Sequence, residues 1–148
     1  MLAPMNPPPL PNKDRDHLRL LVIGHYVAAG LMVPGLGFLA LHYGIMNGVF
    51  GNPEFWQKVK EPPPFDPMMI MGVMRWLYLG FGLMMVVSGV LTLMAGRRIA
   101  QRRGRTFTMV IAALNCMNFP LGMLLGIFTL IVLSRESVER LYVAERVE

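Results

Sequence analysis

Residues 106–134, TFTMVIAALNCMNFPLGMLLGIFTLIVLS, form a run of 29 residues without a charged side chain. A transmembrane α-helix needs about 20 residues, so this run is too long for one straight crossing and too short for two. Two structures fit the pattern: one tilted helix kinked at Pro120, or a short helical hairpin with arms over 106–118 and 120–134. We favour the hairpin, because Asn-Phe-Pro-Leu-Gly is typical of a turn and buried asparagines are most easily satisfied in irregular backbone packed within protein.

Two further uncharged runs precede this stretch, at residues 20–43 and 77–96, and each is long enough to cross a bilayer. We therefore predict an all-α integral membrane protein with three or four transmembrane segments, the last two forming a short broken hairpin. The composition agrees, because 54% of the 148 residues are apolar and only 16% are charged, which is unusual for a soluble domain. The predicted parts are a Pro-rich cytoplasmic tail (1–16), a single helical membrane domain (17–134) with an outer loop (44–67) and a basic cytoplasmic turn (97–105), and a short polar C-terminal tail (135–148).

Basic residues flank the predicted spans and indicate their orientation. Lys13, Arg15 and Arg19 precede the first span. Five arginines follow the second span within nine residues: Arg97, Arg98, Arg102, Arg103 and Arg105. Such short basic flanks mark the cytoplasmic side, so we predict a multi-pass protein of the inner (plasma) membrane with its N-terminus in the cytoplasm. The formal net charge of +5 then favours anionic lipid over nucleic acid as the partner of the arginines.

Glycines recur in patterns that allow helices to pack closely. Gly82, Gly89 and Gly96 are spaced every seven residues and lie along one face of a helix. Gly122 and Gly126 form a GxxxG pattern in the last arm of the predicted hairpin. Without a side chain at these positions, a neighbouring backbone can approach. We predict packing or interaction surfaces at all five.

Polar side chains inside the predicted spans are few. His25, Asn115 and Asn118 are the intramembrane candidates, and each could bind a substrate or make a structural hydrogen bond. A hydrogen-bonded clasp at the turn is the favoured role of the two asparagines. The three uncharged runs contain no Asp or Glu, whereas proton-coupled and cation transporters usually place a carboxylate near the midplane.

Cofactor and enzyme signatures are weak. His25 and His42 are 17 residues apart on one predicted helix, about 25 Å along its axis, so they cannot both ligate one haem. Fourteen methionines raise the possibility of copper. A role as apolar filler is favoured by five methionines that are spread through the spans without a histidine or cysteine nearby to complete a site: Met84, Met85, Met94, Met109 and Met123. A Walker loop and the GxSxG, HExxH and CxxC motifs are all missing from the sequence. We predict a protein that is not an enzyme and has no cofactor or metal.

The two ends of the chain carry a resemblance. The N-terminal His17-Leu18-Arg19-Leu20-Leu21 followed by His25-Tyr26, and the C-terminal Pro120-Leu121-Gly122 followed by Leu125-Gly126-Ile127-Phe128-Thr129-Leu130, resemble a group of small bacterial multi-span membrane proteins without an assigned activity. Members commonly have a threonine where this chain has Met123. The resemblance implies a bacterial inner membrane and a shared fold, and it transfers no catalytic residue.

The most economical function is non-catalytic. We predict an accessory or assembly subunit of a larger membrane complex, because the glycine surfaces exceed what a few short helices need among themselves. Its partners would be membrane protein subunits or further copies of the chain. Two alternatives stay open: a small-solute or ion pathway through an oligomer, using His25, Asn115 and Asn118, and a redox subunit that carries haem or copper.

Overall fold

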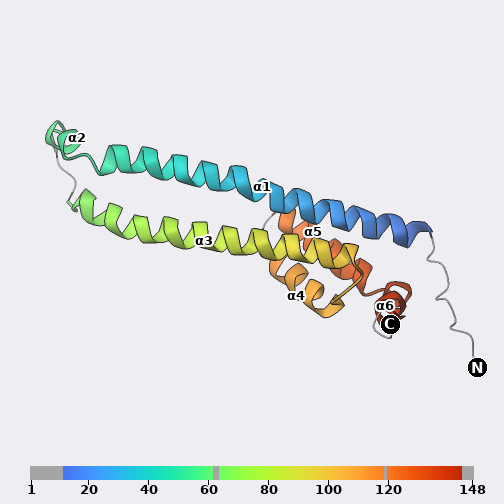
Figure 1. The fold of residues 1–148 in the computed structure, drawn as a ribbon. Coiled ribbons are helices and arrows are strands. Elements are labelled where there is room, and N and C mark those ends of the chain that lie inside the picture. The colour runs from blue at the N-terminus through green and yellow to red at the C-terminus, as the bar shows by residue number, and fades with distance from the viewer. Residues whose placement is uncertain (1–11, 62–63, 119, 145–148) are drawn as a thin grey trace, which may run out of the picture. The chain divides into compact units, whose positions relative to one another are not determined.

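The computed structural model describes residues 12–61, 64–118 and 120–144, and these form helices and short connections without a strand (Figure 1). The helices are α1 (Asn12–Phe50), α2 (Pro53–Gln57), α3 (Pro67–Ala100), α4 (Arg105–Asn115), α5 (Leu121–Leu133) and α6 (Glu136–Ala144). The all-helical prediction is thus confirmed for the described residues. The chain divides into two compact units: the core unit, Met1–Gly30 with Ser88–Glu148, and the paired-helix unit, Leu31–Val87.

Helices α1 and α3 are long and apolar enough, by length and composition, to span a membrane. Their most apolar windows of 18 residues have mean hydropathies of 1.7 and 2.0. Only 11% of the first window and 6% of the second are buried within the chain, whereas the core helix of a soluble protein is mostly buried. Nearly all of this apolar surface is therefore left uncovered by the described residues.

The N-terminal boundary differs from the predicted one. Helix α1 begins at Asn12, so the predicted tail 1–16 is helical over its last five positions, and its first eleven lie outside the described residues. The helix starts directly after Pro11, the last residue of the Pro-rich segment. Asp14 lies in the first turn, where a negative charge interacts favourably with the helix dipole.

The predicted outer loop 44–67 is partly helical. Helix α1 continues to Phe50 because isolated glycines such as Gly44 and Gly48 each cost a helix only about 1 kcal/mol. After a turn, α2 begins at Pro53, and the side chain of Asn52 caps it by accepting a hydrogen bond of 3.0 Å from the backbone N–H of Glu54. Among the described residues of the loop, the irregular ones are therefore 51–52, 58–61 and 64–66.

Helix α3 ends four residues later than predicted, at Ala100, so two arginines of the predicted basic turn 97–105 are helical. The remaining turn is closed by two backbone hydrogen bonds: Arg103 N–H to the Arg98 carbonyl at 2.9 Å and Arg102 N–H to the Ile99 carbonyl at 3.1 Å. This pair is a Schellman motif, and the residue that it places in the left-handed region is Arg102, with φ 52°. Glycine is the usual residue there, and an arginine costs about 1 kcal/mol more.

The run of residues 106–134 forms two separate helices, α4 and α5, which pack along each other (Figure 1). Of the two structures that fit its sequence, the chain has the hairpin. The turn is stabilised by backbone hydrogen bonds from Asn118 N–H to the Asn115 carbonyl at 2.9 Å and from Met123 N–H to the Asn118 carbonyl at 3.0 Å. The helical arms are shorter than the predicted ones, because residues 116–118 and 120 belong to the turn.

The hydrophobic core of the core unit lies where the first turns of α1, the last turns of α3 and α5, and α6 meet. Its buried members are Leu18, Leu21, Ile99, Val132, Leu133, Val138 and Tyr142. The predicted polar tail 135–148 therefore contributes to the core, because Val138 and Tyr142 lie one turn apart on the inner face of α6.

Candidate functional site

A row of small and polar residues on α3 contacts all three predicted intramembrane candidates. The row consists of Ser88, Thr92 and Gly96, which are spaced by four residues and therefore lie along one side of the helix. Asn118 contacts the first of them, Asn115 the second and His25 the third. All six residues belong to the core unit.

The centre of the row is a buried hydrogen bond between α3 and α4. The Thr92 hydroxyl donates to Oδ1 of Asn115 at 3.2 Å, and the two residues are only 1% and 4% exposed. The amide nitrogen Nδ2 of Asn115 is buried without a hydrogen-bond partner within the described part of the chain. A buried amide with one satisfied oxygen and one unsatisfied nitrogen can still donate to a small polar ligand or water.

The outer contact of the row is weaker. Nδ2 of Asn118 donates to the Ser88 hydroxyl at 3.5 Å, and the contact is exposed. This distance is at the limit of a hydrogen bond. Asn115 and Asn118 thus both reach α3, as expected for a clasp between the hairpin turn and its neighbour, and Asn115 makes the stronger link.

His25 lies against the glycine end of the row. A Cβ atom built on Gly96 would be 2.9 Å from Cβ of His25, so only glycine allows α1 and α3 to come this close. The ring is fully buried, and Nδ1 lies 2.8 Å from the Leu21 carbonyl. Because a carbonyl only accepts, Nδ1 carries the proton of this bond. Nε2 is buried and has no hydrogen-bond partner among the described residues.

The five candidate glycines do not form one surface. Gly82 lies in the paired-helix unit, where a built Cβ would contact Leu39 at an ordinary 3.7 Å, whereas Gly89 and Gly96 are buried in the core unit. In α5, Cβ atoms built on Gly122 and Gly126 would lie 2.7 Å from the Asn115 carbonyl oxygen and 2.4 Å from that of Ala112. Gly96, Gly122 and Gly126 therefore serve packing inside the chain.

The arginine cluster also separates into different environments. Arg105 pairs with Glu139 at 2.8 Å and donates to the Leu133 carbonyl at 2.9 Å, which ties the start of α4 to α5 and α6. The guanidinium of Arg98 stacks over the Phe107 ring at 4.3 Å. The other three, Arg97, Arg102 and Arg103, are exposed. The predicted cluster is thus not one continuous basic patch.

A buried carboxylate, which was not among the predicted site residues, joins α1 to the start of α6. Asp14 accepts hydrogen bonds from the Ser137 hydroxyl at 2.6 Å and from the Arg135 guanidinium at 2.8 Å. The same guanidinium donates to Nδ1 of His17 at 3.0 Å. Asp14 precedes the uncharged run that begins at Leu20. The Ser137 hydrogen bond, followed by that of Arg135, holds the pKa of Asp14 below its ordinary value despite burial.

In comparisons with known proteins, no protein family, curated protein or solved structure matches this chain. In the described ranges 12–61, 64–118 and 120–144, no group of three His, Cys, Asp or Glu side chains is arranged to hold a metal ion. The candidate site is therefore the row of Ser88, Thr92 and Gly96 on α3, together with the side chains that contact this row. Sequence reasoning missed Ser88 and Thr92. These residues come eight and four residues before Gly96, and this spacing is the signal that places them on the same side of the helix.

The link between Thr92 and Asn115 is open to a direct test. We expect Thr92→Val to lower the free energy of unfolding by about 1 kcal/mol, because it leaves Oδ1 of Asn115 buried without a donor. Asn115→Leu should have a similar effect, and the double variant should lose less than the sum, with a coupling of about 0.5–1 kcal/mol. Unfolding by SDS titration in neutral detergent measures all four proteins. Strict additivity would show that the two side chains do not interact.

Proposed function

We propose that the chain is an integral protein of a bacterial inner membrane and acts there as a non-catalytic accessory or assembly subunit of a larger complex. The length and hydropathy of α1 and α3, together with the small buried share of their apolar surface, support a lipid environment. The resemblance at both ends of the sequence supports the bacterial membrane.

The core unit supports a proposed orientation. The first turns of α1 and the last turns of α3 lie together, since Leu18 and Ile99 share one core, and basic residues flank both. By the positive-inside rule this end faces the cytoplasm. Helices of 11 and 13 residues measure about 16 and 20 Å, less than the roughly 30 Å of hydrocarbon. We therefore propose two full crossings, with α4 and α5 as a hairpin that enters and leaves on the cytoplasmic side.

A bare glycine face on α1 is the observation that carries the assembly proposal. Cβ atoms built on Gly37, Gly44 and Gly48 would contact nothing within 4 Å. Spacings of seven and four residues place these glycines on one face. None of the three lines the pocket beside α3, to which α1 contributes Leu36, Leu39, Ala40 and Tyr43.

Lipid does not require such a face. Each glycine weakens a helix by about 1 kcal/mol relative to alanine, and lipid tails pack equally well on leucine. Glycines in membrane helices instead allow a second helix to approach closely. Because none of the described residues covers these three positions, a helix of a partner protein is the occupant that gives them a role.

The test is the mass of the native assembly. The tagged protein would be extracted in mild detergent from its own host, and every co-purifying chain identified. We expect a large assembly with stoichiometric partners. Gly44→Leu with Gly48→Leu should release the partners, because leucine side chains fill an open face without disturbing the fold. The matched control is Gly80→Leu, which adds the same side chain at an open position on α3 and should leave the assembly intact. A homogeneous monomer or homo-oligomer would refute the proposal.

A second candidate is a pathway for a small polar solute through a homo-oligomer. It is favoured by Nε2 of His25 and Nδ2 of Asn115, two buried polar atoms that have no hydrogen-bond partner among the described residues and that flank neighbouring turns of α3. In this case the purified chain alone, reconstituted in liposomes, would pass a solute, and Asn115→Leu would block it. The accessory-subunit proposal instead requires that the reconstituted chain be impermeable.

A further inference from the structure

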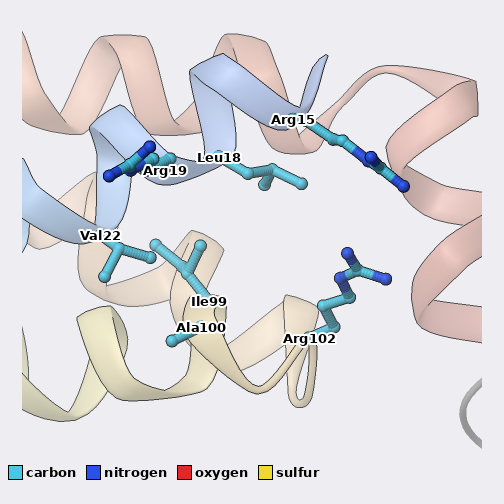
Figure 2. A pocket seen from close by; sticks show the side chains of 7 residues that line it. All are labelled: Arg15, Leu18, Arg19, Val22, Ile99, Ala100 and Arg102. Atoms are coloured by element: carbon cyan, nitrogen blue, oxygen red, sulfur yellow. The ribbon is translucent and has the colours of Figure 1, made fainter. Parts of the chain in front are cut away.

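A hollow of about 170 Å³ lies in the core unit between the start of α1 and the end of α3. Its lining combines two chemistries: the arginines Arg15, Arg19 and Arg102, and the apolar side chains Leu18, Val22, Ile99 and Ala100. Figure 2 shows Arg15 and Arg102 extending toward the same end of the hollow, while Arg19 lies with Val22 at the other end and Leu18 and Ile99 lie between. The site thus has positive charge at both ends and an apolar floor.

Within the described part of the chain, no acidic side chain neutralises the positive charge in the hollow. Among residues 12–61, 64–118 and 120–144, no carboxylate forms an ion pair with any of the three arginines. Asp14, the buried acid of α1, is held by Arg135 and Ser137. Asp16 is exposed and is not part of the lining. The guanidinium groups of Arg15 and Arg102, which extend toward the same end of the hollow, attract an anion, and Arg19 adds positive charge at the other end.

The backbone places Arg102 in the hollow at a conformational cost. This residue adopts φ 52° at the end of α3, a conformation in which glycine is the usual residue. Glycine is two positions away, at Gly104. Strained residues of this kind concentrate at sites where the side chain has a role. The strained residue thus carries a guanidinium that extends toward the same end of the hollow as Arg15.

We propose that this hollow binds the phosphate group of an anionic phospholipid. Guanidinium groups bind phosphate through paired, charge-assisted hydrogen bonds. The volume is below the roughly 300–1,000 Å³ of pockets that enclose a whole small molecule, so the headgroup phosphate enters and the acyl chains stay outside along the apolar helices. The inference rests on the proposed membrane location, because a phosphate-bearing solute presents the same chemistry.

The experiment uses the purified full chain in neutral detergent and measures binding by native mass spectrometry and by titration. The probes are short-chain phosphatidylglycerol, short-chain phosphatidylcholine and inorganic phosphate. The test variant is Arg15→Gln, Arg19→Gln, Arg102→Gly, in which glycine suits the backbone of the third position. The matched control, Lys13→Gln, Arg97→Gln, Arg103→Gln, loses the same three charges at exposed positions outside the hollow.

We expect phosphatidylglycerol to bind the unaltered chain at least tenfold more tightly than either other probe. The test variant should weaken this binding tenfold or more, and the control less than threefold. Equal losses in the two variants would overturn the site in favour of diffuse charge attraction. Equally tight binding of inorganic phosphate would overturn the lipid as its source, and equal binding of phosphatidylcholine would overturn phosphate recognition.

The result of the lipid-binding experiment can be distinguished from the results that test the proposed function. Lipid binding is measured on the isolated chain, so loss of partner subunits through Gly44→Leu and Gly48→Leu leaves it unchanged. Fractionation of host cells with an alkaline wash tests the membrane location independently. A chain that washes off the membrane refutes the location, whereas a chain that stays there and fails to bind phosphatidylglycerol refutes the hollow alone.

Discussion

Replacing Gly126 with alanine is expected to lower the free energy of unfolding by about 3 kcal/mol, at the upper end of what overpacking costs. The added Cβ would lie 2.4 Å from the Ala112 carbonyl oxygen and 3.0 Å from the backbone nitrogen of Cys116. Both atoms belong to the backbone at the end of α4, which cannot move aside as a flexible side chain can. Relief of the clash therefore requires α4 and α5 to separate, which loses the packing of the hairpin.

Gly80→Ala is the matched control for this substitution. A Cβ atom at Gly80 would contact nothing within 4 Å, so alanine should stabilise α3 by about 0.5–1 kcal/mol through its higher helix propensity. SDS titration in neutral detergent, followed by circular dichroism, measures both variants. A Gly126→Ala protein with a stability within about 0.5 kcal/mol of the unaltered chain would contradict the close contact between α4 and α5.

For the hairpin, the sequence predicts the fold but does not predict which helix its glycines contact. The length of the uncharged run and the turn chemistry around Pro120 predict two arms. The GxxxG pattern of Gly122 and Gly126 predicts a close contact but does not specify which helix makes it, since glycine only removes a side chain. The structure assigns that contact to α4 of the same hairpin, and so removes these glycines from the argument for an external partner.

Helix limits were predicted least well, and glycine and arginine account for two of the errors. Gly44 and Gly48 suggest a loop, yet α1 continues through them, because an isolated glycine weakens a helix without breaking it. Likewise Arg97 and Arg98 suggest a turn after the span, although arginine is a good helix former and lies favourably in the last turn of α3.

The polar site was predicted in part. His25, Asn115 and Asn118 stand out because strongly polar side chains are rare in apolar runs. Their counterparts Ser88 and Thr92 do not stand out, since hydroxyl side chains are common in apolar helices and can bond to their own backbone. The sequence therefore identifies the side chains that need partners more readily than it identifies the partners.

The contact between Asp14 and Arg135 could not be predicted, because 121 residues separate them and nothing in the sequence pairs one acid with one base. We expect Asp14→Ala to lower the free energy of unfolding by about 2 kcal/mol at pH 7, as is usual for hydrogen bonds that involve a charged group. The control is Asp16→Ala, which removes the same charge two residues further along α1 at an exposed position and should change stability by less than about 0.5 kcal/mol.

The pH dependence of this difference shows whether the carboxylate itself is the stabilising group. The Ser137 and Arg135 hydrogen bonds make the pKa of Asp14 lower in the folded chain than the value of about 4 expected for the unfolded chain. Its contribution is therefore complete above about pH 4 and is lost as the pH falls through the lower folded value. Other acids titrate in both proteins, so the stability difference between the unaltered chain and Asp14→Ala isolates Asp14. That difference should be constant from pH 7 to about pH 5 and should shrink below pH 4. If it stays constant down to pH 2, the ionised Asp14 does not join α1 to α6.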